Sequence, residues 1–432
     1  ENLEASVKIT VVRLASALPL LIASTAVAFA ETAPKQADVL ENYANIAEAG
    51  YKDSLAAAKK LQVAIEKLIA EPSEATLKAA REAWVVSRVP YMQTEAFRFG
   101  NPIVDEWEGK VNAWPLDEGL FDYIAASDGD DNPENELYVA NVISKETIKV
   151  GGRDIDASKI TKSLLANDLH EAGGVEANVS TGYHAVEFLL WGQDLNGTGP
   201  GAGNRPATDF DTKNCTGGNC DRRAQYLSIV TDLMIDDLKW MAAQWGKNGA
   251  ARLAVTEATG NTGVRAIFTG LGSLTYGEMA GERMKLGLLL HDPEEEHDCF
   301  ADNTHNSHYY DVVGIRNVYL GEYTRPDGSK VSGPSVSDLV RAKDPEVDKR
   351  VRAAIDRTVE QMGVLKQRAE TKERYDQMIA QGNTEGNAVV QAAIDALVAQ
   401  AKELERAIAV LKLEAIQFEG SDSLDDPGNV VP

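Results

Sequence analysis

Several motifs that mark common enzyme classes are missing from this sequence of 432 residues. There is no phosphate-binding loop, no glycine fingerprint for dinucleotides and no GxSxG nucleophile elbow. Both zinc-peptidase helices are missing too. Gly174 stands where an HExxH motif starting at His170 needs its second histidine, and Phe188 stands where HxxEH needs one. Strand-like alternation of polar and apolar residues is nearly absent, so the sequence predicts an all-α protein.

Positive charge is also scarce. The chain carries 43 Lys and Arg against 67 Asp and Glu, a formal net charge of −24. Such a surface repels phosphate backbones and anionic lipid, so we expect no nucleic-acid partner. The same field attracts cations, although an acidic surface also simply keeps a protein soluble. With 44% hydrophobic residues and a mean hydropathy of −0.27, the chain can bury a large core, and its length predicts two domains or halves.

Only one long apolar run is present, at residues 14–29. Lys8 and Arg13 precede it and an Ala-Phe-Ala cleavage site ends it, so residues 1–30 are predicted to be an export signal peptide. The alternative is an uncleaved membrane anchor, but Pro19 and the shortness of the run argue against a full span. We therefore expect an exported protein whose mature chain starts after this signal.

Cysteine is rare, with three in the chain. Cys215 and Cys220 enclose a Thr-Gly-Gly-Asn loop and are predicted to form a disulfide in an oxidising compartment. A metal clip is the alternative, but two thiolates fall short of the four ligands that structural zinc needs. Cys299 is left over, and we interpret it as a buried small residue rather than a nucleophile.

Helical periodicity accounts for most of the remaining sequence. Apolar residues three and four apart predict a long amphipathic helix over residues 37–70. Pro72 separates it from a second helix, from about residue 74 to residue 100, which Pro90 should kink or restart. Further helices are predicted over residues 158–171, 181–191, 222–245, 264–290, 338–368 and 387–413.

The helices fall on either side of a stretch that differs in composition. Residues 195–221 are dense in Gly, Asn, Pro and Asp, which is typical of a connection. We therefore predict two helical-bundle halves, residues 31–194 and 222–415, joined by this Gly-rich loop. A loose tail is expected at residues 416–432.

The stretch TGYHAVEFLLWGQD, residues 181–194, holds the leading candidate site. His184 and Glu187 are three residues apart, so a helix places both on one face, where they could bind one metal ion. Gly182 would let another backbone or a ligand approach closely. The alternative is a half-buried hydrogen bond between the histidine and the glutamate with no metal.

Other polar residues stand where helices should bury apolar faces. In the first half, Arg88, Tyr91, Glu95 and Arg98 follow spacings of three, four and three, which makes one helical stripe. Such a stripe is usually a solvated ion-pair face, but aromatic residues are interleaved with it and indicate partial burial. Asp117 lies in a WPLDE segment that is too apolar for an ordinary exposed loop.

The second half has its own polar cluster. GEMAGERM places Glu278 and Glu282 four apart, among small residues that would allow a close helix–helix approach. Asp298, Asp302 and His305 share one face if their segment is helical. These five residues could line a cleft, hold the two halves together or form a second site. The alternative for His305 is a surface position.

Six stretches in the chain resemble the imelysin family, and more closely the iron-regulated imelysin-like proteins of bacterial cell envelopes. They are RVPYMQTEAFRF, WPLDE, GYHAVE, NCTGGNCDRR, GEMAGERM and HDCFADNTH. The resemblance runs from about residue 37 to about residue 415. It implies an all-helical fold of two related, pseudo-symmetric halves with the functional site at their interface. It also implies a periplasmic or outer-membrane-associated location, a role in iron acquisition and a classification among the metallopeptidases.

By this resemblance His184, Glu187, Glu95 and Asp117 are the expected metal ligands. One histidine and three carboxylates make a hard site that suits iron, manganese or calcium better than structural zinc. We expect a divalent or trivalent metal ion, with iron first and zinc or calcium as alternatives. Arg88 or Arg98 could instead supply the counter-charge that buried carboxylates need.

Three functions fit this sequence. The first is a binding protein that captures iron or a small iron-bearing ligand and works with other envelope iron-uptake proteins. The second is a metallopeptidase in which Glu187 or Glu95 acts as general base toward a metal-bound water. The third is a scaffold whose polar clusters are structural. The export signal, the acidity and the hard ligands favour the first.

Overall fold

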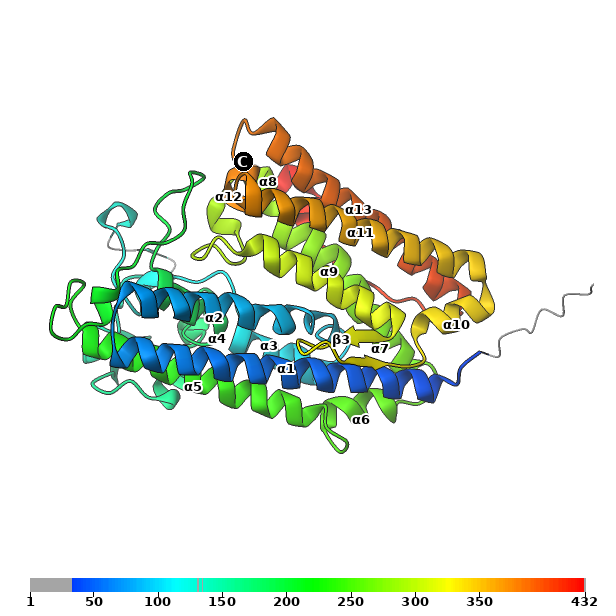
Figure 1. The fold of residues 1–432 in the computed structure, drawn as a ribbon, viewed down its shortest axis with the longest axis horizontal. Coiled ribbons are helices and arrows are strands. Elements are labelled where there is room, and N and C mark those ends of the chain that lie inside the picture. The colour runs from blue at the N-terminus through cyan, green and yellow to red at the C-terminus, as the bar shows by residue number, and fades with distance from the viewer. Residues whose placement is uncertain (1–32, 130–131, 134, 431–432) are drawn as a thin grey trace, which may run out of the picture. The chain divides into compact units, whose positions relative to one another are not determined.

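The computed structural model describes residues 33–129, 132–133 and 135–430, and the predicted signal peptide at residues 1–30 lies outside them. Helices dominate the described chain (Figure 1), which confirms the predicted all-α fold. None of these helices is long and apolar enough to cross a lipid bilayer. The strands of the described chain form two antiparallel pairs, β1 (Thr147–Val150) with β2 (Arg153–Asp156) and β3 (Glu322–Thr324) with β4 (Lys330–Ser332).

The first two helices begin where the sequence predicts. α1 (Gln36–Ala70) is 35 residues long, and α2 (Glu74–Met92) starts at a capping box. In that box the Ser73 hydroxyl accepts from the Thr76 backbone N–H at 3.2 Å, and the Ser73 N–H donates to the Thr76 hydroxyl at 3.0 Å. Pro90 lies in the last turn of α2, and the helix ends two residues later rather than near residue 100.

Two other helix predictions are wrong. The helix predicted over residues 338–368 is two helices, α10 (Val336–Lys343) and α11 (Pro345–Thr371). Asp344 caps α11 by accepting from two backbone N–H groups, and a proline at the first helical position fits that start. In the segment predicted as a helix over residues 158–171, the structure forms only a short π-helix, η4 (Leu164–Leu169).

The prediction over residues 264–290 is confirmed as a continuous helical run, because the π-helix η7 (Leu274–Leu286) joins α7 to α8. The remaining helices are α3 (Pro102–Asn112), α4 (Gly182–Trp191), α5 (Cys220–Gln244), α6 (Ala250–Thr256), α7 (Thr262–Ser273), α8 (Gly287–Leu290), α9 (Thr304–Leu320), α12 (Tyr375–Ile379), α13 (Thr384–Val410), α14 (Asp422–Asp425) and α15 (Pro427–Val430).

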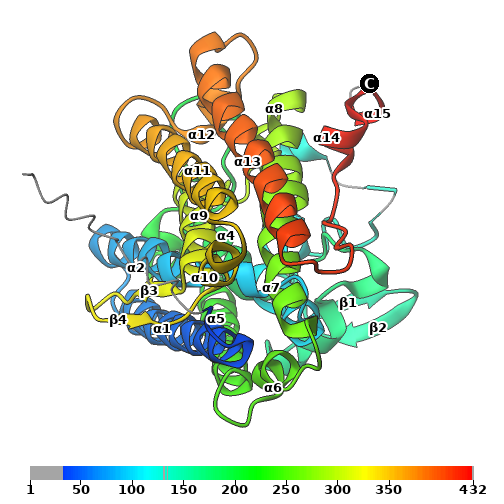
Figure 2. The same cartoon turned by 90° about the vertical axis from the view of Figure 1, so that its right-hand side faces the viewer.

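The helices pack in two groups that share one compact unit. In the first group α1 lies along α2 and α5, with α3 and α4 against them; in the second α9, η7, α11 and α13 pack together (Figures 1 and 2). α2 contacts α9 and so links the two groups. α5 and α6 both follow the Gly-rich loop in the sequence, yet both pack on α1. If the chain divides into halves, we would place the boundary after α6.

The end of the described chain packs onto η7. A Cβ on Gly281 would lie 2.2 Å from the Cβ of Ser421, and a Cβ on Gly277 would lie 2.5 Å from the carbonyl oxygen of Glu419. Ser423 is buried and its hydroxyl donates to the Gly281 carbonyl at 3.0 Å. Gly277 and Gly281 of the GEMAGERM stretch therefore admit this terminal segment close to η7.

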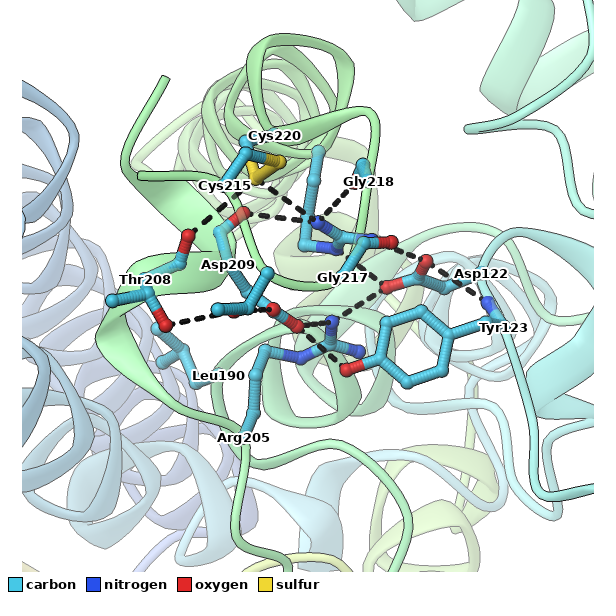
Figure 3. A network of polar contacts seen from close by, with 12 residues as sticks. Asp122, Tyr123, Leu190, Arg205, Thr208, Asp209, Cys215, Gly217, Gly218 and Cys220 are labelled. Atoms are coloured by element: carbon cyan, nitrogen blue, oxygen red, sulfur yellow. Dashed lines mark hydrogen bonds and ion pairs between the residues drawn. A yellow bond between two sulfur atoms is a disulfide. The ribbon is translucent and has the colours of Figure 1, made fainter. Parts of the chain in front are cut away.

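The Gly-rich loop ends in a buried network of charges (Figure 3). Arg223 binds Asp122 through two nitrogens, at 2.7 and 2.9 Å. Arg205 Nη1 lies 2.7 Å from an Asp122 oxygen and 3.0 Å from Asp209. All four side chains are almost fully buried. The two acids thus offset the two arginines, which holds the loop onto the first helix group.

A disulfide between Cys215 and Cys220 closes the last turn of this loop, with the two Cα atoms 5.9 Å apart. The carbonyl of Gly218, inside that turn, accepts from Arg223 at 2.9 Å. The Thr216 hydroxyl donates to Asp209 at 2.9 Å. The disulfide therefore holds two of the groups that satisfy the buried network.

We expect the unreduced protein to contain the Cys215–Cys220 bond, and Cys215→Ser to lower the free energy of unfolding by about 2 kcal/mol, the value for so short a closed loop. Urea denaturation measures the loss, and Cys299→Ser, at the unpaired cysteine, is the control. Mass spectrometry that found both Cys215 and Cys220 as free thiols would contradict this expectation.

Candidate metal centre

Helix α4 carries the GYHAVE stretch and is buried along its whole length. Its first residue, Gly182, has φ +79°, and a Cβ there would lie 2.4 Å from the carbonyl oxygen of Val111. The glycine therefore lets the start of α4 touch the end of α3. Just before it, the Thr181 hydroxyl donates to the carbonyl of Lys110 at 2.9 Å. These contacts fix the position of the first turn of α4 against α3.

His184 and Glu187 lie on one face of α4, as their spacing requires. His184 Nδ1 is 2.8 Å from Glu187 Oε2, and the two residues are 1% and 0% exposed. The other oxygen, Oε1, accepts from the backbone N–H of Ala301 at 2.9 Å. Glu187 is thus placed to orient the ring of the histidine.

The far nitrogen of His184 has no partner. Nε2 is buried and makes no hydrogen bond. Burial, reinforced by the Arg88 charge, lowers the pKa of His184 to about 3, so the ring is neutral at physiological pH. A neutral imidazole whose Nδ1–H donates to a carboxylate presents a lone pair on Nε2, which is the arrangement of a metal-binding histidine.

His297 brings a second imidazole to the first, from the loop that precedes α9. The two ring centroids are 4.8 Å apart and the planes are inclined at 77°. His297 Nδ1 is buried without a partner, and Nε2 lies 3.5 Å from the amide of Asn112. Burial lowers the pKa of His297 well below its ordinary value. In the described chain, His184, His297 and Asp298 are the one triple whose ligand atoms all lie within 4.8 Å of one another.

Asp298 supplies the carboxylate of this triple and shares it with an arginine. Arg88 Nη2 donates to Oδ1 at 2.8 Å, with both side chains at most 1% exposed. Oδ2 accepts from Ser307 at 2.5 Å and from Asn303 at 2.7 Å. Burial alone raises the pKa of Asp298, but Arg88 and these hydrogen bonds outweigh it, so the pKa is lowered and the carboxylate is ionised. Arg88 is thus a counter-charge, as the alternative interpretation of the sequence proposes.

Glu95 lies in another part of the buried polar network. Because α2 ends at Met92, the predicted stripe breaks, and Glu95 falls in a short 3-10 helix, η1 (Glu95–Phe97). It accepts from Arg283 Nη2 at 2.8 Å. Arg283 also binds Glu278 at 2.7 Å and Asp311 at 3.2 Å. The charge of Glu95 is therefore offset by an arginine, and the structure does not group Glu95 with the triple.

Arg98 and Tyr91, from the same predicted stripe, also have structural contacts. Arg98 lies 3.0 Å from Asp105 and within 3.6 Å of Glu108 and Glu278. The Tyr91 ring packs against Tyr183 with centroids 4.9 Å apart, and its hydroxyl is buried without a partner.

Asp298, Asp302 and His305 would share one face only in a helical segment, and the structure does not meet that condition. α9 begins only at Thr304, and Asp302 has φ +51°. Asp302 is buried with one oxygen unpartnered, and His305 Nε2 lies 3.5 Å from a nitrogen of Arg374. Glu282 is exposed on η7.

Asp117 lines a surface cleft of about 580 Å³ rather than the triple. It accepts a hydrogen bond from the Asn135 side chain, and burial raises its pKa. Trp114 lines the same cleft, and its ring lies edge-on to His297 with centroids 5.7 Å apart. Trp114 thus lines the cleft and also contacts His297.

Sequence reasoning missed His297, which follows an acidic run that looks like a helix start, although its position beside Asp298 was a usable signal. Arg283 stands beside Glu282 in the GEMAGERM stretch, but its pairing with Glu278 depends on the π-helix, which the sequence does not predict. His308 is another buried histidine, with both ring nitrogens unpartnered, and burial lowers its pKa to about 3.

Comparison with known proteins agrees with this architecture. The imelysin family (Peptidase_M75) matches residues 47–404. The chain belongs to the imelysin family. Iron-regulated protein A of Synechococcus elongatus is 38% identical over 71 residues, which make up 16% of this chain and 20% of that protein. The matched part is therefore about a fifth of that relative.

Two solved structures share the fold of this imelysin-family chain. A protein of Parabacteroides distasonis designated as an iron-regulated protein A precursor has a TM-score of 0.61 at 18% identity, covering 88% of this chain and 97% of that one. An imelysin-like protein from Psychrobacter arcticum has a TM-score of 0.57 at 16% identity, covering 89% and 99%. At these identities the likeness establishes the fold alone.

Proposed function

We propose that this protein binds a metal ion through His184, His297 and Asp298, and that it serves iron handling in the bacterial cell envelope. The observation that carries this proposal is the triple itself: three buried ligand atoms within 4.8 Å, two of the residues being imidazoles with an unpartnered nitrogen. Buried polar nitrogens without partners are costly, so two neighbouring imidazoles that each keep one such nitrogen point to a ligand.

The donor set favours iron among the metals considered. Two histidines and one carboxylate with open positions are the ligand set typical of non-haem ferrous sites, and imidazole nitrogens also suit zinc. Calcium, which prefers oxygen ligands, fits this set less well. The name of the Synechococcus relative refers to regulation by iron, which supports iron as the biological ion. In this proposal Glu187 orients His184, while Glu95 and Asp117 are not ligands.

Arg88 limits how tightly a cation can be held. Its charge offsets that of Asp298, and burial raises the pKa of Glu187 well above its ordinary value, so little negative charge would balance an ion. We therefore expect reversible binding, which suits capture and hand-over to other envelope iron-uptake proteins better than permanent storage. Residues 1–30, the predicted export signal, would place this function in the periplasm or at the outer membrane.

The peptidase alternative receives less support from this geometry. A general base needs a lone pair that faces the reacting water. Both oxygens of Glu187 accept hydrogen bonds, and Glu95 is bound to Arg283. Neither glutamate is therefore poised for that role.

The metal proposal predicts that His184→Ala and His297→Ala each weaken Fe²⁺ binding at least about tenfold, and that Glu187→Gln weakens it by a similar factor through lost orientation of His184. Anaerobic titration calorimetry on chelator-treated protein measures the affinities, with ZnCl₂ as a second probe. His291→Ala is the control, because His291 contacts the Ile379 carbonyl and not the triple. Unchanged affinity in both the His184 and the His297 variants would end the proposal.

A further inference from the structure

A second, smaller cavity of about 10 Å³ adjoins the Trp114 cleft and holds none of the residues of the triple. Its lining is dominated by carboxylates, among them Glu118, Asp194, Glu294, Glu296 and Asp376. A volume near 10 Å³ admits about one water-sized particle. The cavity is therefore too small for an organic ligand and large enough for one ion or one water.

Two of these carboxylates are buried without any partner. Glu296 is 1% exposed and Asp376 is 2% exposed, and none of their four oxygens makes a hydrogen bond. The pair stands in contrast to two other buried acids: Asp298 is bound by Arg88, and Glu95 by Arg283. Burying an ionised carboxylate without a partner is costly, so this pair needs either a proton or a cation.

Two further acids surround the pair from separate elements. Asp194 follows α4, and Asp302 precedes α9 with one buried oxygen unpartnered. Burial, and then the charges of Asp302 and Asp194, raise the pKa of Asp376 to about 7. The Asp302 carboxyl is raised to about 7 by burial and Asp194, with Arg374 acting in the opposite direction. The four acids thus repel one another, and Arg374 relieves only part of this repulsion.

We propose that this cavity is a second cation site, for a hard divalent ion such as Ca²⁺ or Mn²⁺, with Glu296 and Asp376 as ligands and with Asp194 and Asp302 supplying further negative charge. Carboxylate oxygens are the ligands that such ions prefer. Cys299 also lines the cavity, but burial raises the pKa of its thiol well above the ordinary value, so a soft thiolate is not offered.

The ion would bind with water as well as protein. No three carboxylates here bring their oxygens within 4.8 Å of one another in the described chain. A cation held by two carboxylates therefore needs water to complete its shell, as is usual for Mg²⁺ and frequent for Ca²⁺. The adjoining cleft gives water access to the ion, and its lining includes Asp117, Glu118 and Glu294. This site does not depend on the histidine triple.

The experiment is titration calorimetry of the intact, chelator-treated protein at pH 8, with CaCl₂ and MnCl₂ in separate runs. We expect one ion per chain in the wild type, and at least a tenfold loss of affinity in Glu296→Gln and in Asp376→Asn. Glu82→Gln, which changes an exposed glutamate paired with Lys78, should retain the wild-type Ca²⁺ affinity.

Thermal unfolding separates this proposal from a cavity of protonated acids. With a cation site, CaCl₂ or MnCl₂ raises the Tm of the wild type and leaves the Tm of both variants unchanged. With protonated acids around a water, neither salt changes the Tm of the wild type. Glu296→Gln then has a Tm equal to or higher than that of the wild type, with and without the ions. That second result, or equal ion affinity in wild type and folded variants, would overturn the proposal. Circular dichroism establishes that each variant is folded.

Discussion

Arg283→Met is expected to lower the free energy of unfolding by about 3–5 kcal/mol, the cost of removing one partner from a buried ion pair. The Arg283 guanidinium is 2% exposed and binds Glu95, Glu278 and Asp311. Glu95 and Asp311 are themselves at most 2% exposed. Without the arginine, two fully buried carboxylates and one partly buried carboxylate lose their counter-charge, and methionine of similar volume leaves little cavity to confuse the result.

This loss should depend on pH. Burial raises the pKa of Glu278, but Arg283 and then Arg98 outweigh it, so its folded-state pKa lies below the ordinary value. A group with a lowered pKa stabilises the fold above its unfolded pKa, and this contribution disappears as the pH falls through the folded value. The difference between wild type and Arg283→Met should therefore be largest near neutral pH and shrink below about pH 4.

Urea denaturation at several pH values measures the effect. Arg357→Met is the matched control, since Arg357 is exposed and pairs only with a neighbour on its own helix; its effect should stay within about 0.5 kcal/mol. Adding Glu95→Gln and Asp311→Asn to Arg283→Met should restore part of the lost stability. Equal denaturation midpoints for Arg283→Met and wild type would show that the acids are already protonated.

The sequence predicts the helices better than it predicts the polar network. The spacing of apolar residues in α1, and the Ser73 cap before α2, are local signals that survive in the structure. The break inside the predicted helix over residues 338–368 was also local, since Asp344 and Pro345 form a helix start, and it could have been recognised.

The sequence does not predict the polar pairings, because they depend on irregular backbone conformations. Glu278 and Arg283 are five residues apart, and the π-helix brings them together where α-helical spacing would not. Asp302, in a left-handed conformation before α9, breaks the expected helical face. Within the local geometry of α4, by contrast, His184 and Glu187 do meet. The partner of that pair, His297, comes from 113 residues away in the chain, a distance over which spacing carries no information.

Gly182→Ala should lower the free energy of unfolding by about 2–5 kcal/mol. The positive φ alone costs an alanine about 1–2 kcal/mol, and overpacking adds about 1–3 kcal/mol. The added Cβ would lie 2.4 Å from the Val111 carbonyl oxygen and 2.8 Å from its Cα. These are backbone atoms, so no side-chain rotation relieves the contact, and α4 must shift away from α3.

The same shift of α4 should displace His184 at the candidate metal centre. His184 stands two residues after Gly182 and packs 4.8 Å from His297, so a displaced α4 should also weaken Fe²⁺ binding in whatever fraction of the variant folds. Gly363→Ala is the control, because Gly363 lies inside α11 with its nearest neighbour, a ring carbon of Tyr309, 3.9 Å from the added Cβ. That change should stabilise the protein by up to about 1 kcal/mol. If Gly182→Ala and Gly363→Ala both unfolded at the wild-type midpoint, the prediction would be wrong. The close contact between α3 and α4 would then not explain the glycine at the start of the motif.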